Sequence, residues 1–276
     1  MGMNLYDLAF SLGFSCGGSR ALRRANLQFA SYPLDWTGSP GIVRSARMIE
    51  SDFAGWLDRE DLELVDVRAG RFGNHIYRNR KTGFGFPHEF SSFQTFDELY
   101  APTVEKHRRR IDRLMAHVRA AKKVLVVYVE RPINARADDA DLLETRRILE
   151  SKFPGVRFDL VYFFHADCVS EREIAPGIVS IDCSYRQFVN GEVWHEIDYS
   201  AVADWLAAHV TVADPRSAAE KEEYAVTSRE SKRKRFAGER NPLKRKLNEL
   251  EYKLYRHLGE TLERKGILPR ERALWF

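Results

Sequence analysis

An uninterrupted apolar run, Val124-Leu125-Val126-Val127-Tyr128-Val129, is the feature that most restricts how this chain can fold. A short run rich in β-branched residues predicts a strand that is buried on both faces. The residues directly before it, 103–122, predict an amphipathic helix. Strands buried on both faces occur mainly in parallel sheets that are covered by helices. The run therefore indicates an α/β fold.

The rest of the first 213 residues alternates in the same way. Apolar runs predict strands at 6–12, 158–164 and 177–181, and helical periodicity predicts helices at 17–25, 42–57, 141–152 and 199–209. Residues 58–100 are predicted to be irregular or short-stranded. We therefore predict an α/β domain over residues 1–213 with a parallel sheet in a three-layer core. Ligands of such folds bind at the carboxyl ends of the strands.

Residues 214–276 differ in composition, because they carry 17 Lys and Arg against 11 Asp and Glu, whereas the whole chain has a net charge of only +4. Asn241 and Pro242 mark a helix start, and a leucine stripe follows them. We predict a C-terminal helical, basic extension in which the helix over residues 242–266 packs its leucines against its own domain or a second copy of the chain and keeps its charged face in solvent. The alternative is that this segment binds an anionic membrane surface, a polyanionic polymer or a partner chain. No nucleic-acid partner is expected, since aromatic residues are not interleaved with the basic ones.

Targeting and cofactor signals are sparse. No signal peptide and no run of about 20 apolar residues is present, so a cytoplasmic location is expected. Cys16, Cys168 and Cys183 form no CxxC pair, which favours free thiols and argues against a metal site. No phosphate loop or dinucleotide fingerprint is present. We expect no bound cofactor other than an acyl carrier such as coenzyme A.

Cys16 is the candidate nucleophile. It lies in Ser11-Leu12-Gly13-Phe14-Ser15-Cys16-Gly17-Gly18, where a predicted strand passes into a predicted helix. The free N–H groups at the start of a helix favour a thiolate and can bind an oxyanion. Gly13 and Gly17 allow the backbone to approach a substrate closely. The alternative is that Cys16 is a small buried residue and the glycines only shape a turn.

A thiol nucleophile needs a base, and His88 in Gly85-Phe86-Pro87-His88-Glu89 is the first candidate. His195 competes with it, because it precedes the last predicted helix, where esterases of the Ser-Gly-Asn-His type place their base. His165, directly after a strand, is a third choice. Asp35 is expected either to orient the base or to cap a turn.

Several of these segments together resemble a bacterial family of unknown function described as papain-like cysteine peptidases. The resemblance rests on Ser11-Leu12-Gly13-Phe14-Ser15-Cys16, Leu22-Arg23, Ser31-Tyr32-Pro33-Leu34-Asp35-Trp36 and His88-Glu89-Phe90. Leu34 stands where the family carries Phe, and Glu89 stands where it carries Asp. The resemblance implies that Cys16 is the nucleophile and His88 its base.

The reaction class that follows is acyl transfer, by a hydrolase or an acyltransferase, because both use an acyl-enzyme and an oxyanion. Such families often accompany proteins of cell-surface polysaccharide synthesis, which implies a small-molecule or glycan substrate. The alternative from another class is a non-catalytic binding or scaffolding module of a polysaccharide machinery.

Overall fold

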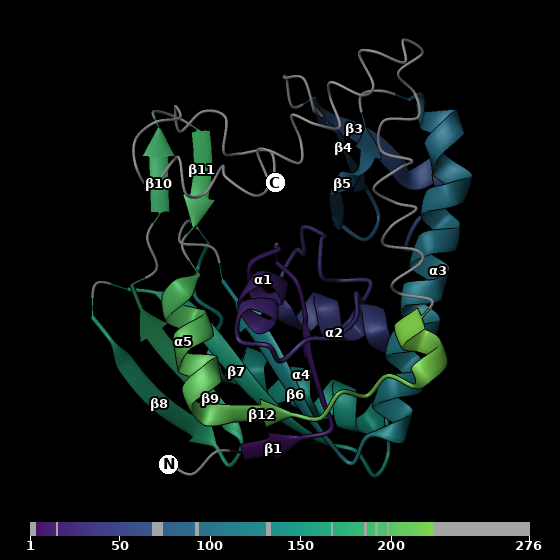
Figure 1. Cartoon of the computed structure of the whole chain (residues 1–276). Coiled ribbons are helices and arrows are strands. Elements are labelled where there is room, and N and C mark those ends of the chain that lie inside the picture. The colour runs from purple at the N-terminus through teal and green to yellow at the C-terminus, as the bar shows by residue number, and fades with distance from the viewer. Residues whose placement is uncertain are drawn as a thin grey trace.

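The computed structural model describes residues 4–14, 16–67, 74–91, 94–130, 134–166, 168–184, 187–190, 193–197 and 199–222 (Figure 1). The predicted helix over 242–266 lies outside these residues. The domain boundary at 213/214 stays a prediction.

A five-stranded sheet forms the centre of the molecule, and the predicted apolar run is its second strand (Figure 1). From Val124 onward every residue of that strand is buried, which confirms a strand covered on both faces. The strand order is β2-β6-β7-β9-β8, and only β8 runs antiparallel to its neighbour. The bounds are β2 (Leu8–Ser11), β6 (Lys123–Val129), β7 (Arg157–His165), β8 (Ser170–Ala175) and β9 (Ile178–Cys183).

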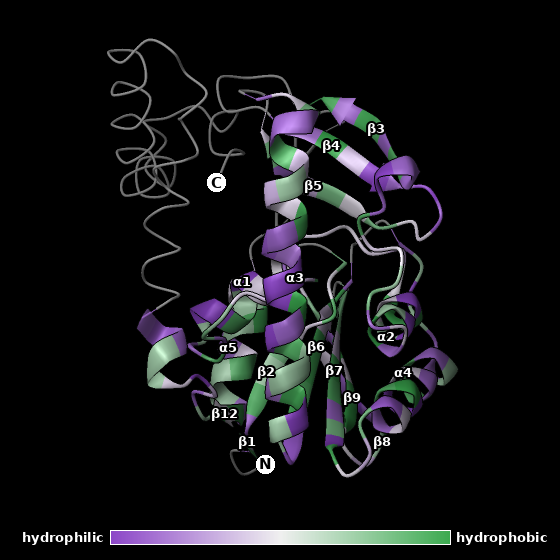
Figure 2. Cartoon of the chain, turned by 90° about the vertical axis from the view of Figure 1, so that its right-hand side faces the viewer, coloured by the Kyte–Doolittle hydropathy of each residue, from purple (hydrophilic) through white to green (hydrophobic). Residues whose placement is uncertain are grey.

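Helices cover both faces of this sheet, as the alternating pattern predicts (Figure 2). Alternate residues along β7 belong to two separate apolar clusters: Val161 and Phe163 pack toward one face, and Leu160 and Tyr162 toward the other. The first face carries α1 (Cys16–Arg24) and α5 (Ser200–His209). The second face carries α2 (Ile42–Glu50), α3 (Phe96–Ala120) and α4 (Asp139–Lys152).

A second, antiparallel sheet lies beyond the main sheet beside the first half of α3 (Figures 1 and 2). It is made of β3 (Leu62–Val67), β4 (Asn74–Asn79) and β5 (Gly85–Ser91), and the short 3-10 helix η1 (Arg59–Asp61) precedes it. The rings of Tyr77 of β4, Phe90 of β5 and Phe96 of α3 pack against one another at centroid distances of 4.6 to 5.2 Å. The aromatic residues of the segment predicted to be irregular or short-stranded thus join a sheet to a helix.

Two small pairs of strands complete the described fold. The strand β1 (Asn4–Tyr6) pairs in parallel with β12 (Val210–Val212), and β10 (Gln187–Asn190) pairs with β11 (Val193–Ile197) as a hairpin. Within the described ranges, no helix has the length and apolar character that a membrane crossing requires.

Candidate active site

The turn between β2 and α1 places Cys16 at the carboxyl edge of the parallel sheet. Gly13 and Phe14 have positive φ angles of 90° and 65°, so the chain reverses sharply after the strand. The buried hydroxyl of Ser11 accepts the N–H of Gly13 at 3.1 Å. That N–H group is therefore used within the turn, and Gly13 shapes the turn that presents Cys16.

Cys16 is the first residue of α1 and is half-buried, so the thiol is at the start of the helix as predicted. Cys183, in contrast, is buried at the end of β9, and burial together with Asp182 raises its pKa to about 11. Cys168 is exposed. Of these thiols, Cys16 is therefore the one that combines partial exposure with the N–H groups of a helix start.

The loop that follows α1 is fixed by Asp35, whose carboxylate is fully buried. Its Oδ2 accepts hydrogen bonds of 2.7 Å from the backbone N–H of Tyr32 and from Nε2 of Gln28, and Arg23 lies 3.8 Å away. Burial raises the pKa of Asp35, and Arg23 opposes that change. These contacts tie the loop to itself and to α1, and the role of Asp35 in orienting a histidine stays a prediction.

His88 lies on β5 with its side chain exposed, and its ring meets Trp36 edge to face at a centroid distance of 6.2 Å. Backbone hydrogen bonds connect this strand to the turn that carries Cys16. Gly38 and Gly85 bond each other in both directions at 2.8 Å, and the N–H of Ser39 donates to the carbonyl of Phe14 at 3.2 Å. The loop with Trp36 therefore joins the His88 strand to the Cys16 turn.

Glu89, the neighbour of His88 in β5, is buried against α3, whereas His88 is exposed. Lys106 forms an ion pair with it, Arg110 lies 3.2 Å away, and Nε2 of His107 lies 3.1 Å away. These contacts anchor β5 to α3 at the residue next to His88.

A family model described as "Putative papain-like cysteine peptidase (DUF1796)" matches residues 7–168, more than half of the chain. The chain belongs to this family. Searches of curated proteins and of solved structures found no match. The resemblance predicted from the Cys16, Asp35 and His88 segments is therefore confirmed, since all three lie within the match.

The other candidate bases of this papain-like protein lie on strands of other sheets than the one that carries His88. His165 is the last residue of β7, half-buried, and the alternation along β7 puts it on the same sheet face as α1 and α5. His195 belongs to β11, beyond the family match, and its side chain lies outside the described part of the structure. His165 is thus a described competitor of His88.

Tyr199 also lies against the first turn of α1, which the sequence did not predict. It precedes α5, and its phenol ring occupies the space beside Gly17 where a side chain would stand. A Cβ atom at Gly17 would lie 2.3 Å from Cζ and 2.5 Å from Oη of Tyr199. No local pattern marks a tyrosine so far along the chain as a neighbour of Cys16.

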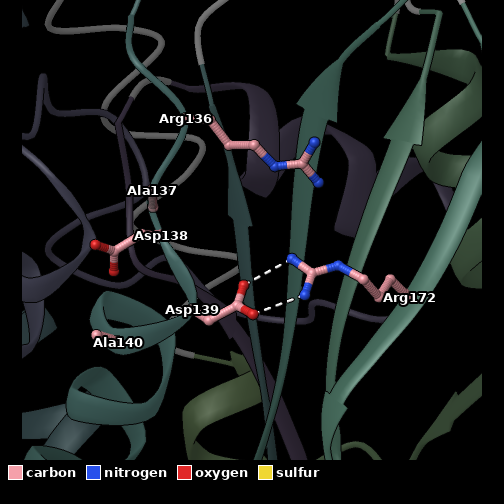
Figure 3. Close-up of a pocket in the computed structure, with 6 residues that line it drawn as sticks. All are labelled: Arg136, Ala137, Asp138, Asp139, Ala140 and Arg172. Carbon is pink, nitrogen blue, oxygen red and sulfur yellow. Dashed lines mark hydrogen bonds and ion pairs between the residues drawn. The ribbon is translucent and has the colours of Figure 1, made fainter.

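A separate pocket of about 500 Å³ lies at the start of α4 (Figure 3). Its two arginines are paired within the protein: Arg172 binds Asp139 at 2.6 and 2.7 Å, and Arg136 lies 2.7 Å from both Ser180 and Asp182. None of the predicted catalytic residues lines this pocket. The described residues contain no cluster of His, Cys, Asp and Glu that suits a metal ion.

Proposed function

We propose that this papain-like protein is a thiol-dependent acyl-transfer enzyme in which Cys16 is the nucleophile and His88 the base. The observation that carries the proposal is the position of Cys16, half-buried at the first residue of a helix and at the carboxyl edge of a parallel sheet. This is where such folds bind ligands and where a thiolate gains stabilisation from backbone N–H groups.

The reaction proceeds through a thioester. His88 accepts the proton of the Cys16 thiol, and the sulfur attacks the acyl carbon, so that the carbonyl electron pair moves to oxygen. Collapse of this oxyanion breaks the bond to the leaving group, which takes the proton from His88. Water or a hydroxyl acceptor then attacks the thioester in the same way and releases Cys16.

The group that attacks the thioester determines the reaction: water makes the protein a hydrolase, and a hydroxyl acceptor makes it an acyltransferase. We infer a sugar hydroxyl of a cell-surface polysaccharide precursor as acceptor, in the cytoplasm, with coenzyme A as one acyl carrier. The exposure of His88 and the partial exposure of Cys16 support access for a bulky acceptor.

Acetylation by p-nitrophenyl acetate, followed by mass spectrometry of the whole protein and of its peptides, tests the proposal. We expect one acetyl group on Cys16, its loss in Cys16→Ser, and its retention in Cys168→Ser, which removes an exposed thiol. His88→Asn should slow acetylation roughly 100-fold. If His165→Asn slows it and His88→Asn does not, His165 is the base. If Cys16 is not acetylated, the proposed enzymatic function is wrong and a non-catalytic binding module is favoured.

A further inference from the structure

Tyr199 meets α1 at its first turn. The ring atoms Cζ and Cε1 and the hydroxyl Oη would lie 2.3 to 2.5 Å from a Cβ atom at Gly17, so the end of the phenol fills the place of that side chain. Gly17 is buried and directly follows Cys16. The phenol hydroxyl is therefore beside the backbone of the residue next to the thiol.

Packed elements hold this ring in place. Leu22 of α1 and Val202 and Leu206 of α5 share one apolar cluster, against which Tyr199 packs. The carbonyl of Tyr199 also accepts the N–H of Ala203 at 2.9 Å, which fixes its backbone at the start of α5. A group held by two packed helices is positioned before a substrate arrives, as stabilisation of a developing charge requires.

The chemistry at this position is that of a hydrogen-bond donor. The first N–H groups of an α-helix have no carbonyl partner within that helix, and a helix start can bind a developing negative charge. A neutral phenol donates one hydrogen bond and keeps its proton. Such a donor strengthens its bond as the carbonyl becomes an oxyanion.

We propose that the hydroxyl of Tyr199 donates a hydrogen bond to the oxyanion that forms when Cys16 attacks an acyl group. The role rests on the proposed function, because it requires an acyl substrate on Cys16. In the attack the sulfur–carbon bond forms and the carbonyl electron pair moves to oxygen. The phenol O–H and the N–H of Gly17 hold that oxygen until the leaving group departs.

Two reactions of the same thiol separate this role from a structural one. Alkylation by iodoacetamide displaces iodide and forms no oxyanion, whereas acetylation by p-nitrophenyl acetate does. In Tyr199→Phe we expect acetylation of Cys16 to slow by about 10- to 100-fold, with alkylation within about 2-fold of wild type. Tyr100→Phe is the matched control, because it removes a phenol that bonds the carbonyl of Leu57 away from Cys16.

The outcomes separate the hypotheses. Equal slowing of both reactions in Tyr199→Phe would make the ring a structural support and overturn the donor role, as would unchanged acetylation. Wild-type protein that is never acetylated at Cys16 would overturn the proposed function together with this role. As a second variant, Gly17→Ala displaces the ring and should reproduce the selective loss. Thermal unfolding of each variant verifies that it is folded.

Discussion

Gly38 and Gly85 exchange two backbone hydrogen bonds, each 2.8 Å long. Together with the edge-to-face contact between Trp36 and His88, this bridge connects the loop that carries Trp36 to the strand that carries His88. Since Ser39 bonds the carbonyl of Phe14 at 3.2 Å, one short segment contacts both the strand of the proposed base and the turn of the nucleophile. The distance between Cys16 and His88 thus depends on a contact that involves neither residue.

Substitution at Gly38 tests this dependence. Gly38→Pro removes the N–H that donates to Gly85, so we expect a loss of about 1 kcal/mol of stability and a roughly 100-fold slower acetylation of Cys16. Gly38→Ala is the control, because its Cβ would lie 3.7 Å or more from Gly85 and keep both bonds. Equal acetylation rates in the two variants would show that the bridge does not position the site.

Gly18 packs on Ser11 beneath the same turn, and this contact explains why glycine stands there. A Cβ atom at Gly18 would lie 2.4 Å from Oγ and 3.1 Å from Cβ of Ser11. Gly18→Ala should therefore lower the free energy of unfolding by about 1–3 kcal/mol. Ser11→Gly removes both atoms, so the double variant should be less destabilised than the sum of the single variants. Urea unfolding of the four proteins measures the coupling, and strict additivity would contradict the packing.

The central sheet was predictable because its strands are apolar on both faces, whereas local polar contacts set several boundaries. The predicted strand 6–12 is interrupted at Asp7, whose carboxylate accepts the N–H groups of Lys122 and Lys123 at 2.8 and 2.9 Å. The hydrophobic pattern of the sequence does not reveal such an interruption, because it arises from hydrogen bonds to residues far along the chain. The boundary follows from tertiary contact.

The long helix shows a second limit. Its predicted start is residue 103, but α3 begins at Phe96, because Thr95 and Glu98 form a capping box. In the candidate site, the position of Cys16 at a turn was predictable, because a strand pattern is followed directly by a helix pattern there. The position of Tyr199 was not, since its contact with Gly17 depends on how α5 packs on α1.

Asp35 is predicted to hold its loop through hydrogen bonds that need an acceptor. Asp35→Ala leaves the buried N–H of Tyr32 and the amide of Gln28 without that acceptor, which should cost about 2–4 kcal/mol of stability. Asp35→Asn keeps an oxygen in the same place and should cost less. Chemical denaturation at pH 7 compares the two. A larger loss in Asp35→Asn than in Asp35→Ala would show that the carboxylate's bonds do not stabilise the loop.

His107 should make the fold sensitive to acid. Burial, with Arg110 and Lys106 nearby, holds the pKa of this imidazole well below its usual value, and its Nδ1 accepts the indole N–H of Trp56 at 3.0 Å. In the unfolded chain the imidazole takes up a proton below about pH 6.5, whereas the folded protein keeps it neutral. The unfolded state then binds more protons, so the free energy of unfolding falls as the pH falls below that value.

The expected slope from His107 approaches about 1.4 kcal/mol per pH unit below pH 6 and vanishes above pH 7.5. His107→Asn retains an acceptor for Trp56 and does not titrate, so it should be less stable at pH 7.5 but lose less stability between pH 7 and 5. His75→Gln removes another histidine, from β4, and serves as the control. Urea unfolding at each pH gives the slopes. If the free energy of unfolding of His107→Asn falls with pH as steeply as that of wild type, the acid sensitivity does not come from His107.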